Sequence, residues 1–217
     1  MNPLNSYIEH TNLKPTLIGK AVDRLVAEAI DYQFHGVCVP PFWVKRASRE
    51  IGRNDTKLVT VIGFPLGYQM TETKLKEIQM AIVDGVDELD LVINISAFKD
   101  GMPWPKIEIA QCAKLCHSEE KVLKVIIETA YLTQNEIKSA ALVAKDAGAD
   151  FVKTSTGFAS SGAQEKDIRL LRDILPDHVG IKASGGIKTR QHTMEMIAAG
   201  ADRIGTSSGL EIIGAIA

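Results

Sequence analysis

Eight short apolar segments, each followed by a polar turn and a helix-length amphipathic stretch, predict an α/β fold that is a single (β/α)8 TIM barrel. A short repeat supports this phasing, because Gly-Val-Asp or Gly-Ala-Asp occurs at residues 85–87, 148–150 and 200–202, where predicted helices give way to strands. The length agrees as well, since 217 residues give about 27 for each of eight units, close to the lower size limit of this fold. The sequence therefore predicts one domain over residues 1–217.

The predicted strands are rich in Val, Ile and Leu and end at polar or glycine-containing turns. In chain order they lie near Tyr7–His10, Val37–Val39, Leu58–Ile62, Glu88–Ile93, Val122–Ile127, Phe151–Thr154, Gly180–Ala183 and Arg203–Gly205. The helix between the fifth and sixth strands is the most clearly marked. Thr133 and Glu136 form a predicted capping box, and small apolar residues then recur at the helical period as far as Gly148.

A doubly wound open sheet is the competing architecture. Such a sheet usually has fewer strands, and its dinucleotide-binding form carries Gly-x-Gly-x-x-Gly after the first strand. The segment after Tyr7–His10 has no such fingerprint. The pattern therefore favours the closed barrel.

Composition and charge restrict the classes of function. The net charge is -2 and the pI is near 6.2, so we expect no nucleic-acid partner and no anionic membrane surface. No apolar run reaches the length of a membrane span, and the polar Met1-Asn2-Pro3 start lacks the regions of a signal peptide. We therefore expect a cytoplasmic protein.

The three cysteines are too few for a disulfide framework in a chain of this length, so we expect them to be reduced. Cys112 and Cys116 stand four apart on a predicted helix beside His117, which resembles half of a metal site. With no second cluster of ligands, helix packing is the better interpretation, and Cys38 is expected to be a small core residue.

Charged residues occur on three predicted strands where a barrel has its active site. Lys153 ends the sixth strand before a Thr-Ser-Thr-Gly turn, Lys182 lies on the seventh and Asp90 on the fourth. If their apolar neighbours pack outward against helices, all three point into the barrel. Two nearby ammonium groups lower the pKa of one lysine, which can then attack a carbonyl as a free amine and form a Schiff base. Asp90 would balance the remaining charge and pass protons. A buried structural ion triad is the alternative.

The loops after the seventh and eighth strands predict a phosphate site. They read Ser-Gly-Gly-Ile-Lys at residues 184–188 and Gly-Thr-Ser-Ser-Gly at residues 205–209, and a predicted helix follows each. Glycines let backbone N–H groups approach an anion, and helix N-termini favour negative charge. Ser207, Ser208 and Lys188 would add donors.

Two motifs, Lys-Thr-Ser-Thr-Gly at residues 153–157 and Lys-Ala-Ser-Gly-Gly at residues 182–186, occur with further matches at 9–15, 61–67, 88–94, 124–129 and 203–209. Through them nearly the whole chain resembles the deoxyribose-phosphate aldolase family. The resemblance implies reversible cleavage of 2-deoxy-D-ribose 5-phosphate to acetaldehyde and D-glyceraldehyde 3-phosphate, in deoxynucleoside catabolism. It also implies a Schiff-base mechanism without metal or cofactor.

By motif position, the resemblance makes Lys153 the Schiff-base lysine, Lys182 the lysine that perturbs it, and Asp90 the carboxylate of the proton relay. It places the phosphate grip at Gly157, Gly185, Gly186, Lys188, Gly205, Ser207 and Ser208.

The sequence departs from the family pattern in three places. Glu9 stands where the family usually has Asp, and it is left out of the catalytic set. Phe158 stands where some members have a lysine, so the phosphate grip would depend on backbone groups and Lys188. The sequence stops at residues 213–217 without the longer tyrosine-ending tail of some members, so no proton transfer by such a tail is expected.

Two alternative functions remain at this point. One is a phosphosugar isomerase or epimerase on the same barrel, with Asp90 as base and no covalent intermediate. The other is a non-catalytic barrel that binds a phosphorylated sugar as a sensor or scaffold, although binding phosphate does not require two inward lysines. The expected partner is a small phosphosugar, and a homodimer is left open because helix faces that pack on a partner resemble those that pack on the barrel.

Overall fold

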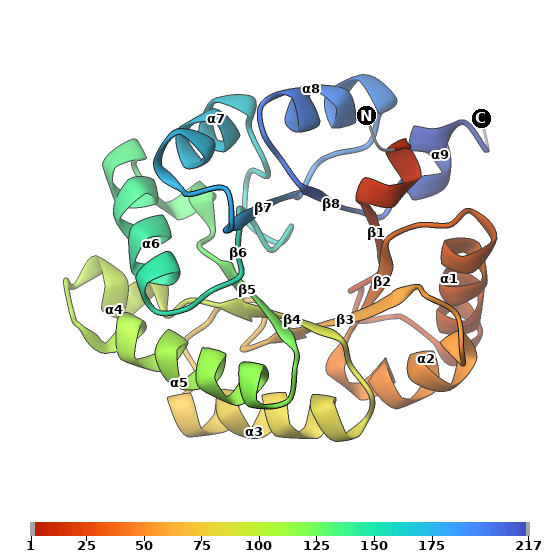
Figure 1. Cartoon of the computed structure of the whole chain (residues 1–217), viewed down its shortest axis with the longest axis horizontal. Helices are drawn as coiled ribbons and strands as arrows, with labels where there is room; N and C mark the ends of the chain where they lie inside the picture. Colours follow the sequence, from red (N-terminus) through yellow and green to blue (C-terminus); the bar gives the residue numbers. More distant parts are fainter. Residues whose placement is uncertain (1–2, 216–217) are drawn as a thin grey trace.

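The computed structural model describes residues 3–215, and within them eight parallel strands form a closed barrel surrounded by helices (Figure 1). Each strand pairs with the next and β8 pairs with β1, which confirms the predicted TIM barrel. The strands are β1 Ile8–Thr11, β2 Gly36–Val39, β3 Lys57–Ile62, β4 Glu88–Val92, β5 Val122–Ile126, β6 Phe151–Lys153, β7 Gly180–Ser184 and β8 Arg203–Thr206. All eight coincide with predicted segments to within two residues.

The helices follow the strands in the order that a (β/α)8 chain requires. The α-helices are α1 Gly19–Asp31, α2 Val44–Ile51, α3 Thr71–Val83, α4 Ile95–Lys99, α5 Trp104–Ser118, α6 Gln134–Asp146, α7 Glu165–Ile174, α8 Arg190–Ala198 and α9 Gly209–Ile213. Single turns of 3-10 helix are η1 Leu4–Tyr7, η2 Pro41–Trp43 and η3 Thr129–Tyr131. The capping box predicted at Thr133 and Glu136 is present at the start of α6.

Met1, Asn2, Ile216 and Ala217 lie outside the described residues, so the expectations about a signal peptide and a tyrosine tail, which concern the two ends, are not addressed there. Across residues 3–215 no helix combines the length and the apolar character that crossing a membrane requires.

The apolar core has two parts because successive strand residues face opposite sides of the sheet. The large outer part lies between the strands and the helices, and it contains Leu89 and Leu91 on either side of Asp90. Cys112 and Cys116 are free thiols in this outer core, so the helix-packing interpretation is confirmed.

The smaller part of the core lies at Cys38, Val59 and Val61 on β2 and β3, where Leu13 and Phe64 pack against it. Strands β1 and β4 to β7 contribute charged side chains at buried positions: Glu9, Asp90, Lys124, Lys153 and Lys182. The barrel interior is thus apolar at β2 and β3 and ionic at β1 and β4 to β7.

Candidate active site

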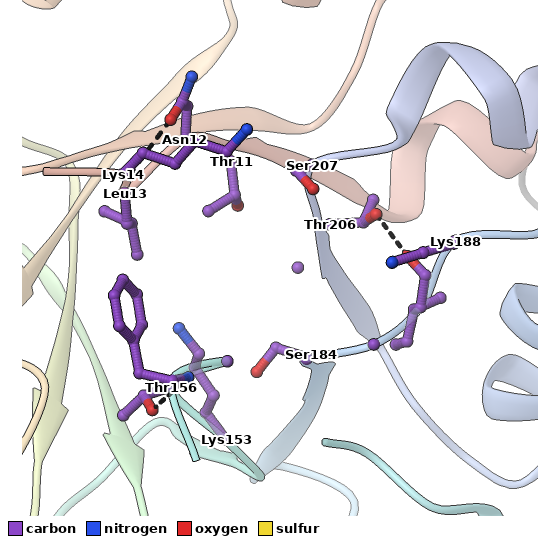
Figure 2. A pocket seen from close by; sticks show the side chains of 16 residues that line it. Thr11, Asn12, Leu13, Lys14, Lys153, Thr156, Ser184, Lys188, Thr206 and Ser207 are labelled. Atoms are coloured by element: carbon purple, nitrogen blue, oxygen red, sulfur yellow. Dashed lines mark hydrogen bonds between the residues drawn. The ribbon is translucent and has the colours of Figure 1, made fainter. Parts of the chain in front are cut away.

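A cavity of about 300 Å³ opens among the loops that follow β1, β6, β7 and β8 (Figure 2). Figure 2 shows Lys153 and Ser184 on one side of it and Thr206, Ser207 and Lys188 on another. Thr11, which ends β1, and the next residues as far as Lys14 close a further side. They fall within the 9–15 match but were not among the predicted site residues. The cavity therefore lies at the C-terminal end of the strands, where barrel enzymes have their active sites.

Lys153 reaches the floor of this cavity from β6, and its amine lies 2.8 Å from Asp90 Oδ2. Lys182 on the adjacent strand β7 is in register with Lys153, and its amine lies 2.6 Å from the same oxygen. Both Asp90 and Lys182 are fully buried behind Lys153. The structure thus brings the three predicted catalytic residues together around one carboxylate oxygen.

The electrostatics of this cluster favour a free amine at Lys153. Burial lowers the pKa of Lys153 most, and the Lys182 ammonium lowers it further, although Asp90 opposes both. Burial also disfavours the charge on Lys182, but Asp90 and Glu9 together hold its pKa above the usual value. Burial is thus the larger cause of the lowered pKa of Lys153, and the second lysine is a smaller one. The extent of this burial depends on closure of the barrel around the side chain.

Three more charged residues join the cluster, and the sequence did not assign them to it. Lys124 on β5 lies 3.0 Å from Asp90 Oδ1, 2.6 Å from Glu88 Oε2 and 3.5 Å from Glu9 Oε1. Glu9, which the sequence left outside the catalytic set, also accepts a short hydrogen bond from Lys182. A usable signal was present, because Lys124 is flanked by Leu123 and Val125 just as Asp90 is flanked by leucines.

One group of side chains has the spacing of a metal site, and a lysine already occupies it. Glu9, His35 and Glu88 bring ligand atoms within 4.8 Å of one another. The Lys124 ammonium contacts both carboxylates, and the two acids hold its pKa above the usual value together with Asp90, although burial opposes this. A metal cation at this position would meet a cation of the protein itself.

The predicted phosphate loops meet at the cavity. The cavity-lining residues include Gly157, Gly185, Gly186, Lys188, Gly205 and Ser207, but not Ser208. Gly185 and Gly186 have φ angles of +84° and +76°, which glycine adopts without steric cost. The Thr206 hydroxyl donates to Ile187 O at 2.7 Å and accepts from Ser208 N at 2.9 Å, so it ties the two loops together.

The turn after Lys153 is held by Glu128, a residue that the sequence did not single out. Glu128 follows β5 with a φ of +52°, an uncommon value for a residue other than glycine. Its buried Oε2 accepts a hydrogen bond from Thr156 N at 3.1 Å and another from the Thr156 hydroxyl. That hydroxyl in turn accepts from Phe158 N at 3.1 Å, and Thr156 lines the cavity.

Phe158 at the cavity is apolar, and Cys38 in the barrel interior is inert. Phe158 is exposed, lines the cavity and lies edge-on to Phe64 with ring centroids 5.3 Å apart, so it offers no donor to an anion. Cys38 is fully buried, and burial raises the pKa of its thiol to about 11. A thiol with that pKa is a poor nucleophile at neutral pH, consistent with a packing role.

A closed barrel with a buried lysine amine facing a cavity is the arrangement of a barrel enzyme that acts through an amine nucleophile. Residues 7–215 match the model of the DeoC/LacD family aldolases, and the chain belongs to that family.

Relatives of this chain match it in sequence or in structure over almost its full length. A deoxyribose-phosphate aldolase of Thermococcus gammatolerans is 50% identical over 210 residues, which cover 95% of this chain and 93% of the relative. A solved structure described as QR15, an aldolase, superimposes with a TM-score of 0.93 at 41% identity and covers 99% of this chain and 96% of its own. A deoxyribose phosphate aldolase from Aeropyrum pernix, described as having a unique tetrameric structure, gives a TM-score of 0.91 at 35% identity, with coverage of 98% and 90%.

Proposed function

We propose that this chain catalyses the reversible aldol cleavage of 2-deoxy-D-ribose 5-phosphate to acetaldehyde and D-glyceraldehyde 3-phosphate, and that residues 1–217 act as one catalytic domain. The observation that carries the proposal is the Lys153 amine, whose pKa is lowered by burial and by Lys182 and which faces the cavity. The glycine- and serine-rich loops after β7 and β8 lie on the same cavity, where a phosphate would be held at a distance from the amine.

In the proposed mechanism, the Lys153 amine adds to C1 of the open-chain sugar, and loss of water gives a protonated imine. The C2–C3 bond then breaks, its electron pair moves toward the imine to form an enamine, and the C3 hydroxyl loses its proton as D-glyceraldehyde 3-phosphate leaves. Protonation of the enamine at C2 and hydrolysis release acetaldehyde and regenerate the amine. Asp90 and Lys182, acting through a water molecule, move these protons.

A direct test of the proposed function is turnover of 2-deoxy-D-ribose 5-phosphate by the purified chain, with both aldehyde products measured. Formation of acetaldehyde and D-glyceraldehyde 3-phosphate in equal amounts is the expected result. Conversion to an isomeric pentose phosphate without acetaldehyde would instead favour the isomerase alternative, and binding without turnover would favour the sensor.

Lys188 is expected to contribute to binding of the substrate phosphate. Replacing Lys188 with alanine should raise KM for 2-deoxy-D-ribose 5-phosphate by about 10- to 100-fold, because a charge-assisted contact contributes about 1.5–3 kcal/mol, and should change kcat little. Steady-state kinetics with phosphorylated and unphosphorylated deoxyribose measure this. Lys14→Ala on another side of the cavity is the matched control. An equal loss with both sugars would contradict a role at the phosphate.

Glu128 is expected to position the turn that carries Thr156. Glu128→Gln replaces an acceptor of two hydrogen bonds by an amide and should lower kcat/KM by about 10- to 100-fold, because small displacements of catalytic groups have effects of this size. The control is Glu136→Gln, since Glu136 also pairs with a threonine but is only partly buried, at the start of α6 and away from the cavity. Steady-state assays of both variants check this, and wild-type kinetics in Glu128→Gln would refute it.

Two further features are the location of the protein and its assembly. We propose a cytoplasmic enzyme that assembles as a homodimer and binds a phosphosugar but neither nucleic acid nor membrane. Because the Aeropyrum pernix relative is described as tetrameric, light scattering of the purified chain should distinguish a dimer from a tetramer.

A further inference from the structure

A chain of charged side chains runs through the barrel from Lys153 to its opposite, N-terminal end. Asp90 contacts Lys153 at 2.8 Å and Lys124 at 3.0 Å through its two oxygens. Lys124 contacts Glu88 Oε2 at 2.6 Å, and Glu88 Oε1 lies 3.1 Å from Nε2 of His35. His35 directly precedes β2, and 17% of its side chain is exposed. Four contacts therefore link the proposed nucleophile to a half-buried histidine.

The charges of this side-chain network do not balance when Lys153 is in its reactive state, the free amine. With Glu9 included, the network holds three carboxylates and three lysines, so it is neutral when every lysine is protonated. When Lys153 is a free amine, three negative charges face two positive ones. Burial opposes the charge on Glu88, yet Lys124 and His35 hold its pKa well below the usual range, so Glu88 contributes one of the negative charges.

We propose that protonated His35 supplies the missing positive charge, so that it stabilises the network in the state in which Lys153 is a free amine. This inference rests on the proposed function, because it concerns the amine that attacks the sugar. His35 would be a positioning residue that acts through Glu88 and Lys124, without contact to substrate. Histidine suits this role because it ordinarily changes charge between pH 5 and 8.

The groups that face His35 come from several strands. Glu9 on β1 and Glu88 on β4 each place a carboxylate oxygen within 4.8 Å of a His35 ring nitrogen. The Lys124 ammonium on β5 contacts both of these carboxylates. The net charge beside the ring is therefore negative, so a positive charge at His35 would have carboxylate partners on two strands.

Other charged residues at this end of the barrel face solvent or have partners of their own. Lys57 at the start of β3 is exposed. Asp87 accepts a hydrogen bond from Leu58 N at 2.8 Å. Arg203 at the start of β8 donates to Asp202 O at 2.9 Å.

The predicted effect has a definite sign. His35→Gln removes the positive charge and so raises the pKa of Lys153. The acid limb of the kcat/KM profile should therefore move to higher pH by about 0.5–1 unit. A unit charge produces a shift of about this size across roughly 10–15 Å of protein interior. Near pH 6 this shift corresponds to a loss of about 3- to 10-fold in kcat/KM of the variant relative to the wild type. Above pH 8 the variant and the wild type should agree, because an unprotonated imidazole and the glutamine amide are both uncharged.

Two further variants separate charge from structure. His35→Lys keeps a cation at every pH, so its acid limb should lie at or below the wild-type position. Glu88→Gln removes a negative charge, so it should move the acid limb in the opposite direction from His35→Gln.

A matched control is His117→Gln. His117 also pairs with a carboxylate, 3.0 Å from Asp150 Oδ2, but lies exposed on α5 outside the network. Its profile should superimpose on that of the wild type.

The experiment is kcat/KM for 2-deoxy-D-ribose 5-phosphate between pH 5 and 9, with thermal unfolding of each variant in parallel. A uniform loss at all pH values in His35→Gln, or an acid limb shared with the wild type, would overturn this inference alone. A His35→Lys profile like that of His35→Gln would do the same. Absence of turnover by the wild type would overturn the proposed function and this inference with it.

Discussion

Lys153→Met is expected to lower kcat by about 10⁴-fold or more, because Lys153 is the one lysine among the described cavity-lining residues that contacts Asp90, and an activated nucleophile contributes at this scale. Methionine is close to lysine in length and suits a buried position. Asp90 keeps its contacts with Lys124 and Lys182, so the variant should remain folded. Steady-state kinetics and circular dichroism of the purified variant measure both expectations.

The control for this variant is Lys74→Met. Lys74 is also a fully buried lysine, paired with Glu108 at 2.6 Å between α3 and α5, outside the barrel interior. Its replacement should reduce stability by about 3–5 kcal/mol, as expected when one partner of a buried pair is removed, and should leave the nucleophile in place. Retained turnover in Lys153→Met would contradict the assignment of Lys153.

Asp90→Asn should separate attack by the amine from the proton transfers that follow. Asp90 is the group that raises the pKa of Lys153, so without its charge burial and Lys182 lower that pKa further and the free amine remains available. Turnover should fall by about 10²- to 10⁴-fold, because a positioned acid–base group contributes this much. Borohydride should still trap a covalent adduct, which mass spectrometry of the intact variant would detect.

Asp90→Asn should also destabilise the fold, since Asp90 contacts three lysine amines, and two of them, the Lys124 and Lys182 ammonium groups, would lose the carboxylate that balances their repulsion. Urea unfolding should show a loss of about 3–5 kcal/mol. A folded Asp90→Asn variant with wild-type turnover would show that another group moves the protons. A folded variant that forms no adduct would instead place Asp90 in the attack step.

Much of the fold was predictable because its determinants are local. Val, Ile and Leu runs mark the strands, and Gly85, Gly148 and Gly200 adopt the positive φ values that end helices. The inward direction of Asp90 followed from its leucine neighbours, since strand residues alternate between the two faces. Lys153 and Lys182 could be paired for the same reason, once eight strands were counted.

The rest of the site depends on contacts between segments far apart in the chain. Glu9 meets Lys182 only because β8 closes the barrel against β1, and Glu128 reaches Thr156 only because β5 lies beside β6. Burial of the cluster, which is the main cause of the lowered pKa of Lys153, is likewise a property of the closed barrel. Neither these two contacts nor the burial of the cluster follows from the spacing of residues within one segment of the sequence.

The central claim is that the Lys153 amine forms the covalent intermediate. The most direct measurement is to incubate the protein with 2-deoxy-D-ribose 5-phosphate or acetaldehyde, reduce it with borohydride, and map the modified peptide by mass spectrometry. Our account predicts one stable adduct, on Lys153. An active protein with no adduct on any lysine, or with its adduct on Lys182 or Lys124, would contradict it.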